Sequence, residues 1–102
     1  MAEFRKALTT AELPSGRSTC VELEGKKIAV FNVDGNFYAI DDTCTHRGGP
    51  LSEGDLSGTE VTCPWHHATF DVTDGRVVSP PAPTPVASYE VKVEGEAVMV
   101  KV

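Results

Sequence analysis

The sequence lacks the features that mark membrane and nucleic-acid-binding proteins. No run approaches the roughly 20 apolar residues that a membrane-spanning helix requires, and the start, Met1 to Lys6, carries no apolar signal segment. Basic residues are few and scattered, with nine Lys and Arg against fifteen Asp and Glu and a net charge of -6. Phosphate binding needs clustered positive charge. We therefore expect a cytoplasmic protein with no membrane and no nucleic-acid partner.

Cysteine is also scarce, and its count is odd. Three cysteines in a chain that we expect in the cytosol disfavour a disulfide framework and favour metal or redox use. The apolar content of 40% and the charged content of 24% are ordinary values for a globular protein. A chain of 102 residues can form one domain with a modest core, but not a large enzyme cleft.

Helical periodicity is nearly absent, whereas alternation of apolar and polar residues is common. One helical turn is predicted over Thr10 to Leu13, with Thr9 or Thr10 as its cap. The dipeptide Asp34-Gly35 predicts a tight hairpin, because its residues tolerate positive φ. The other alternating segments predict strands over 19–24, 27–33, 37–40, 89–93 and 98–102, with the last two joined at Glu94-Gly95-Glu96.

The stretch from Asp41 to Pro85 has a different composition, rich in glycine and proline. Strands are predicted there at 60–62, 69–72 and 76–79, and Asp74-Gly75 joins the last two. The segment Pro80 to Pro85 cannot donate the hydrogen bonds of a β-ladder. The sequence therefore predicts an all-β protein in which a loop-rich insert separates two groups of base strands.

Two matched pairs of metal-ligating residues lie in this insert. Cys44-Thr45-His46 is followed, after sixteen residues, by Cys63-Pro64-Trp65-His66. Two thiolates and two imidazoles are also the ligands of tetrahedral zinc sites. Zinc fingers, however, place Cys near Cys and place the two His together on a helix. Here each loop offers one Cys and one His, an arrangement that suits a two-iron cluster.

The segments Cys44–Leu51 and Cys63–Asp71 resemble the two cluster-binding loops of the Rieske family, and the similarity covers essentially the whole chain. The resemblance implies one 2Fe-2S cluster, with both Cys on the inner iron and both His on the outer iron. It also implies a Rieske-like fold in a single domain, residues 1–102. An antiparallel β base would comprise 1–42 and 84–102, and a cluster-binding subdomain would comprise 43–83. The implied ligands are Cys44, His46, Cys63 and His66.

Departures from the high-potential members of that family predict a low reduction potential. Those members carry an extra Cys in each loop and Ser and Tyr hydroxyls that bond to the cluster sulfurs. The matching positions here are Gly49, Trp65, Ala68 and Phe70. Hydrogen bonds to the sulfurs raise the potential, so we expect a value in the lower part of the Rieske range, roughly -150 to 0 mV.

The function implied by the resemblance is one-electron transfer rather than catalysis. Rieske ferredoxins of this length carry electrons from a flavin-dependent NADH reductase to a terminal ring-hydroxylating oxygenase, and no catalytic residues are predicted. The small subunit of assimilatory nitrite reductase is the main alternative, because its loops are similarly rich in sequence like Arg47 to Gly54. A zinc-stabilised interaction module is the third reading.

Residues around the two loops give further expectations. Gly48 and Gly49 would allow close approach to the cluster, and Pro80 to Pro85 would form a third loop over it. His67 is expected to be an exposed neighbour rather than a ligand. Trp65 is expected to pack over the cluster.

Two expectations concern residues beyond the ligand motifs. Cys20 is expected to be a structural thiol on a strand far from both loops. Around His46 and His66, Glu53 and Asp55 would be charged contacts to a basic partner.

Overall fold

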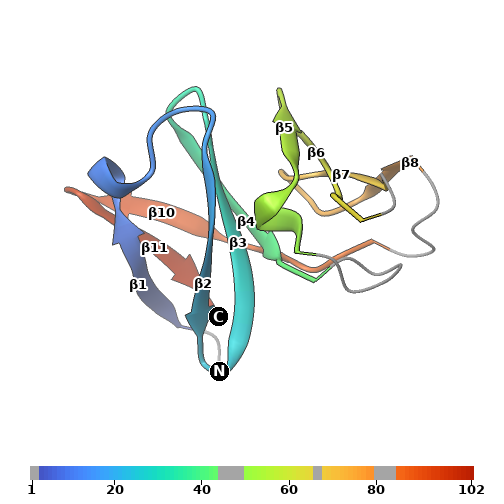
Figure 1. Cartoon of the computed structure of the whole chain (residues 1–102). Coiled ribbons are helices and arrows are strands. Elements are labelled where there is room, and N and C mark those ends of the chain that lie inside the picture. Colours follow the sequence, from blue (N-terminus) through green and yellow to red (C-terminus); the bar gives the residue numbers. More distant parts are fainter. Residues whose placement is uncertain (1–2, 44–49, 66–67, 80–84) are drawn as a thin grey trace.

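The structure, a computed structural model, describes residues 3–43, 50–65, 68–79 and 85–102. They form an all-β fold with two 3-10 turns (Figure 1). No helix in these ranges is long and apolar enough to cross a membrane. The elements are β1 (Phe4–Thr9), η1 (Thr10–Glu12), β2 (Ser18–Leu23), β3 (Lys26–Val33), β4 (Asn36–Asp41), η2 (Leu51–Glu53), β5 (Asp55–Ser57), β6 (Glu60–Thr62), β7 (Thr69–Asp71), β8 (Val77–Ser79), β9 (Ser88–Tyr89), β10 (Val91–Glu94) and β11 (Ala97–Lys101).

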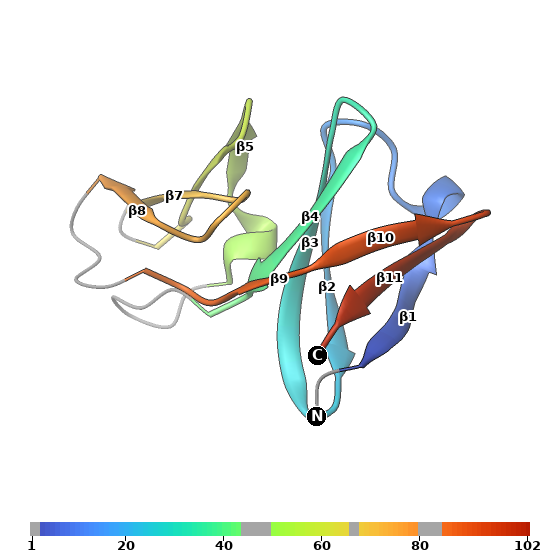
Figure 2. The ribbon, with the colours of Figure 1, turned by 180° about the vertical axis from the view of Figure 1, so that it is seen from behind.

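The strands form three antiparallel sheets in two regions. The base consists of two sheets, with strand orders β1-β11-β10 and β2-β3-β4-β9. The third sheet, with order β5-β6-β7-β8, lies beside the base, and we call it the ligand sheet because its strands flank the second predicted loop. Figure 2 shows the same separation from behind, with β9 leading from the side of the ligand sheet into the base.

Strand β3 separates two hydrophobic cores. Its side chains alternate between faces, so Ile28 and Val30 are buried in the core of the base. Ala29 and Phe31 point the other way, into a core shared with the ligand sheet. Burial on both faces explains why this segment reads as an apolar run rather than as a simple alternation.

Hairpin turns set the register of the base strands. Val33 pairs with Asn36 across the two-residue turn Asp34-Gly35, and both turn residues have positive φ, 52° and 91°. This is the tight hairpin that the sequence predicts. The predicted turn at Gly95 is likewise confirmed, because Glu94 pairs with Ala97 across it.

The structure confirms the predicted helical turn and adds elements that the sequence did not predict. Thr9 caps η1, since its N–H donates to Glu12 Oε1 at 2.8 Å. Strand β1 was not predicted, because a bulge between Lys6 and Leu8 breaks its alternation. Strand β5 was also not predicted, since Asp55 and Ser57 on either side of Leu56 are residues typical of turns rather than of strands.

Candidate metal centre

Of the four predicted ligands, Cys63 is the one that the structure describes. Cys44, His46 and His66 lie outside the described residues, as do His67, the glycines at 48 and 49, and the segment 80–84. Accordingly, the described part of the chain contains no group of three or more Cys, His, Asp or Glu side chains that could hold a metal. The described residues do, however, show how each candidate loop begins and ends.

The second candidate loop is closed at its base by a backbone hydrogen bond. Cys63 follows β6, and its N–H donates to the carbonyl of Ala68 at 2.7 Å. One step further along the hairpin, the hydroxyls of Thr62 and Thr69 lie 3.2 Å apart. The residues from Pro64 to the position before Ala68, which include His66, are therefore enclosed between two paired strand ends.

The side chain of Cys63 lies in an apolar environment. It is 1% exposed and belongs to the same core as Leu51, Val61, Ala68 and Phe70. A charged thiolate in such surroundings is costly unless a metal neutralises it. Ala68 and Phe70 are themselves fully buried, and neither side chain carries a hydroxyl. The buried, apolar surroundings of Cys63 therefore suit a metal-bound sulfur.

The first candidate loop is closed by a bridge and by Asp42. Thr43 and Pro50 form an isolated antiparallel bridge on either side of residues 44–49. The carbonyl of Asp42 accepts the N–H of Leu51 at 2.7 Å, and its Oδ1 accepts the N–H of Ser52 at 2.8 Å. These contacts fix where the segment containing Cys44 and His46 leaves the base and returns.

A third closure lies beyond β8. The N–H of Val86 donates to the carbonyl of Gly75 at 2.9 Å. Gly75 has φ +80°, and a Cβ there would lie 2.2 Å from the Val86 carbonyl oxygen, so only glycine fits. The chain from β8 to Val86, which contains the proline-rich segment, therefore leaves and rejoins the same hairpin.

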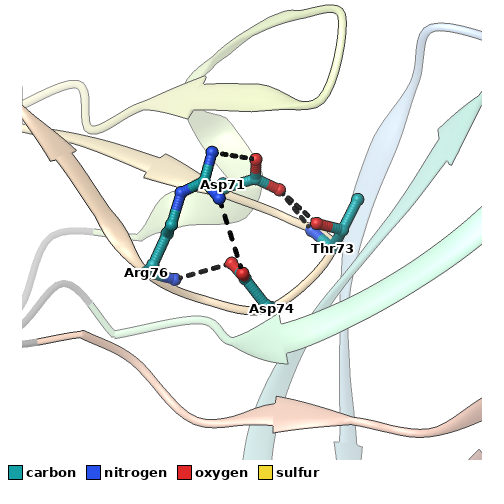
Figure 3. A network of polar contacts seen from close by, with 4 residues as sticks. All are labelled: Asp71, Thr73, Asp74 and Arg76. Atoms are coloured by element: carbon teal, nitrogen blue, oxygen red, sulfur yellow. Dashed lines mark hydrogen bonds and ion pairs between the residues drawn. The ribbon is translucent and has the colours of Figure 1, made fainter.

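A polar network shapes this hairpin turn (Figure 3). Asp71 Oδ1 accepts the N–H and the hydroxyl of Thr73, and its Oδ2 lies 3.2 Å from Arg76 Nη2. The Arg76 N–H also donates to Asp74 Oδ1 at 3.0 Å. Burial would raise the pKa of Asp71, but the Thr73 hydrogen bonds and the Arg76 charge outweigh it and lower that pKa. The carboxylate therefore stays ionised and keeps the turn closed.

One expectation about a single residue needs revision. Cys20 lies on β2, but it is exposed, and Asp42 at the base of the first loop is near enough for its charge to act on the thiol, so Cys20 is not far from both loops. Partial desolvation of the thiol, followed by the charge of Asp42, raises the pKa of Cys20, which disfavours the reactive thiolate. Trp65 is 55% exposed, and its packing over the cluster stays a prediction.

Sequence reasoning did not single out two of these anchoring residues, Asp42 and Asp71. The motif Asp71-Val72-Thr73 has the spacing of a side-chain turn, so its pattern was present. Nothing in the sequence marks Asp42, because its partner Ser52 is ten residues away. Such contacts across a loop are visible only in the folded chain.

Comparison with known proteins identifies the family and gives its relatives. Residues 3–90 match the family described as Rieske [2Fe-2S] domain. The chain is 40% identical over 94 residues to the ferredoxin component of a naphthalene 1,2-dioxygenase system of Pseudomonas aeruginosa, covering 92% of this chain and 90% of that protein. It is 43% identical over 98 residues to a biphenyl dioxygenase ferredoxin subunit of Pseudomonas sp. (strain KKS102), covering 95% and 90%.

Solved structures agree with the fold. The ferredoxin in a complex of reduced oxygenase and oxidized ferredoxin of carbazole 1,9a-dioxygenase superposes with a TM-score of 0.90 at 36% identity, covering 95% of this chain and 91% of that one. A Mycobacterium tuberculosis protein described as a putative NADH-dependent nitrite reductase small subunit superposes equally well, TM-score 0.90, covering 100% and 96%. Its identity of 24% supports a shared fold alone.

Proposed function

Because the chain belongs to the Rieske 2Fe-2S family, we propose that it is a one-electron carrier of a ring-hydroxylating oxygenase system. In this proposal Cys44, His46, Cys63 and His66 hold one 2Fe-2S cluster. Electrons arrive from a flavin-dependent NADH reductase and leave to a terminal oxygenase. The observation that carries the proposal is the burial of Cys63 in an apolar core, at the closed base of a loop that also contains His66.

The ligands differ in their roles. When bound, the cluster supplies a one-electron couple whose potential depends on its ligands and their surroundings. We assign Cys44 and Cys63 to the inner iron, and the 1% exposure of Cys63 supports this. The imidazoles of His46 and His66 would lie on the outer iron, nearer to a docking partner. Their neutrality keeps the oxidised centre near zero charge, which makes reduction easier than with four thiolates.

The proposed domain organisation follows from the same loops. We propose a single domain with a base of residues 1–42 and 84–102 and a cluster-binding subdomain of residues 43–83. The Thr43–Pro50 bridge and the Gly75–Val86 hydrogen bond support boundaries near these positions. The core that β3 shares with the ligand sheet supports one domain rather than two.

We further propose that the chain carries electrons and is not itself a catalyst. A hollow between the β3–β4 turn and the β5–β6 turn, lined by Asn32 and Leu56 among others, has a volume of about 130 Å³. Pockets that bind small substrates usually measure roughly 300–1,000 Å³. This hollow, in the part of the chain that the structure describes, is too small to enclose an aromatic substrate. The similarity to ferredoxin components of dioxygenase systems supports a chain that delivers electrons to a separate oxygenase.

The relatives favour the oxygenase system over the alternatives. Two ferredoxin components of dioxygenase systems share 40% and 43% of aligned residues with this chain, whereas the nitrite reductase subunit shares 24%. Membership of a 2Fe-2S family argues against a zinc module. The composition, acidic and without a long apolar run, supports the cytoplasm as the location.

Charge on the ligand sheet supports docking to basic partners. Residues 43–83 contain no lysine, and the carboxylates of Glu53, Asp55 and Glu60 are exposed. Glu60 lies directly opposite Asp71 in the β6–β7 ladder. We propose that this face and the rim around His46 and His66 meet positively charged surfaces. Electron transfer should then slow as salt is added.

The proposed function is tested on the purified protein. Iron and acid-labile sulfide analysis should give two irons and two sulfides per chain, and the reduced protein should show the low average g value typical of imidazole-ligated clusters. His46→Ala and His66→Ala should lose the cluster, whereas Cys20→Ala should keep it. The protein should then transfer electrons from a dioxygenase-system reductase to its oxygenase. A colourless protein that binds one zinc per chain would refute the proposal.

A further inference from the structure

The base of the first loop contains a buried carboxylate that is not a predicted ligand. Asp42 is 6% exposed and lies directly after β4, two residues before Cys44. A buried polar group persists only where its hydrogen-bonding capacity is used. The contacts of Asp42 therefore indicate its structural role.

Asp42 connects three segments that are distant in sequence. Its N–H donates to the Lys27 carbonyl of β3 at 3.0 Å, which fixes its backbone to the base. Its carbonyl and its Oδ1 accept successive N–H groups of Leu51 and Ser52, the first residues of η2. The loop thus leaves the base at Asp42 and returns to the same residue.

Strand β2 adds a second layer to this contact. The hydroxyl of Ser18 on β2 donates to the Ser52 carbonyl at 2.7 Å. Ser52 is therefore held through both its N–H, which donates to Asp42, and its carbonyl, which accepts from Ser18. Hydrogen bonds to a charged acceptor are about twice as strong as neutral ones. The bond from the Ser52 N–H to the Asp42 carboxylate is therefore the strongest of the hydrogen bonds that hold Ser52.

We propose that Asp42 is a positioning residue that fixes the first ligand loop, so that Cys44 and His46 reach the cluster with a defined geometry. The inference rests on the proposed ligand set. It assigns Asp42 no contact with the metal. Its effect would pass through Ser52 and η2 to the loop that the Thr43–Pro50 bridge encloses.

The chain offers a closely matched control. Asn32 is also 6% exposed, and its Oδ1 also accepts a backbone N–H, that of Gly35, at 2.8 Å. Its Nδ2 donates to the Leu13 carbonyl at 2.7 Å. Asn32 thus stabilises turns of the base, whereas Asp42 stabilises a ligand loop. Both substitutions to Ala remove a buried acceptor of a backbone N–H.

The test compares the purified holoproteins. In Asp42→Ala, iron release to a ferrous chelator after reduction should be faster by about tenfold or more, the factor expected for losing a hydrogen bond to a charged group. The electron paramagnetic resonance lines of the reduced cluster should also shift or broaden. Asp42→Asn keeps an Oδ1 acceptor but loses its charge, so its rate of iron release should lie between those of wild type and Asp42→Ala. Asn32→Ala should lower the melting temperature but leave both cluster signals unchanged.

Several outcomes would overturn the inference. Cluster signals that change equally in Asp42→Ala and Asn32→Ala would show that Asp42 acts only through general stability. Unchanged signals in Asp42→Ala would show that it does not position the loop. If Asp42→Ala does not fold, the shorter Asp42→Ser side chain provides the same comparison. A wild-type chain without iron and sulfide would instead overturn the proposed function, which these variants do not test.

Discussion

The base and the ligand sheet are built from the same secondary structure but depend on different sources of stability. The longest base strand, β3, has eight residues, whereas every strand of the ligand sheet has three. Such short strands contribute little by backbone pairing alone. The ligand sheet instead depends on the core that it shares with β3 and β4, on the loop closures, and on the proposed metal. Regular strands can thus support a region that is too small to order itself.

Removal of the cluster is expected to have the largest effect. After reduction and chelation, amide protection in β5 to β8 should fall by about tenfold or more, because the loops lose their common centre. Protection in β2 to β4 should persist, since those strands also close the core of the base. Hydrogen exchange followed by mass spectrometry gives the measurement. Equal loss of protection along the whole chain would mean that the two regions are one cooperative unit.

The two faces of β3 allow the comparison to be sharpened within one strand. Phe31→Ala should cost about 3–5 kcal/mol of stability and should also speed cluster release, because its side chain faces the shared core. Ile28→Ala should cost about 2–5 kcal/mol without speeding release, because it faces the core of the base. Thermal unfolding and chelator kinetics measure the two effects. Release rates that follow stability alone would contradict the separation of the cores.

The second ligand loop provides a prediction for the reduction potential. With Ala68 and Phe70 in place of two hydroxyl donors, the midpoint potential should lie at roughly -150 to 0 mV. Ala68→Ser with Phe70→Tyr should raise it by roughly 100 mV or more, because each new bond to sulfur favours the reduced cluster. Protein-film voltammetry measures both values.

The outcome of that double substitution separates two explanations. A wild-type potential above about +100 mV would contradict the argument from missing donors. A low wild-type potential that the double substitution leaves unchanged would mean that the loop holds these side chains away from the cluster. Ala29→Ser is the matched control, since Ala29 is equally buried in the same core but lies on β3.

The smallest expected effect concerns Tyr89 on β9, whose hydroxyl donates to Asp41 at the end of β4. Burial, followed by its hydrogen bond to Asp41, raises the pKa of Tyr89 to about 12. A raised pKa adds stability below the ordinary value of about 10, and this stability is lost as the pH rises through about 12. Tyr89→Phe should cost about 1 kcal/mol near neutral pH, since the pair is partly exposed.

The pH dependence tests the assignment directly. Urea unfolding at pH 8 and near pH 11 should show wild type losing more stability than Tyr89→Phe, which lacks the titrating hydroxyl. Equal losses in both proteins would mean that other groups cause the alkaline effect. Tyr38→Phe is the matched control on the neighbouring strand β4.

The sequence predicted the fold well wherever a strand kept its alternation. The segments at β3 and β4 were readable because apolar residues alternate, or run continuously, between clear turns such as Asp34-Gly35. Strand β1 escaped prediction because its bulge shifts the pattern by one residue. Sequence patterns therefore predict strands in which each face is either buried or exposed along its whole length. They fail where a bulge interrupts the alternation.

The ligands of the site were predictable from the sequence, but the residues that hold the ligand loops in place were not. Cys63 stands out because cysteine and histidine are rare and occur here in matched pairs. Asp42 does not stand out, since its partner Ser52 is ten residues away. Gly75 was readable as a turn residue, but its contact with Val86, eleven residues away, was not. Their roles depend on how the loops return, which no local pattern encodes.

The closure of each loop by its own backbone contact has a consequence for exchanging sequence between relatives. The enclosed stretches end at the Thr43–Pro50 bridge, at the Cys63–Ala68 hydrogen bond and at the Gly75–Val86 hydrogen bond. Because these contacts use main-chain atoms, they tolerate most side-chain changes inside the enclosed stretches. Each stretch can therefore be transplanted as a cassette between homologous scaffolds, provided that glycine is kept at position 75. Chimeras cut at these points should keep the folding behaviour of the recipient, and they should take on the potential of the donor when positions 68 and 70 are exchanged as well.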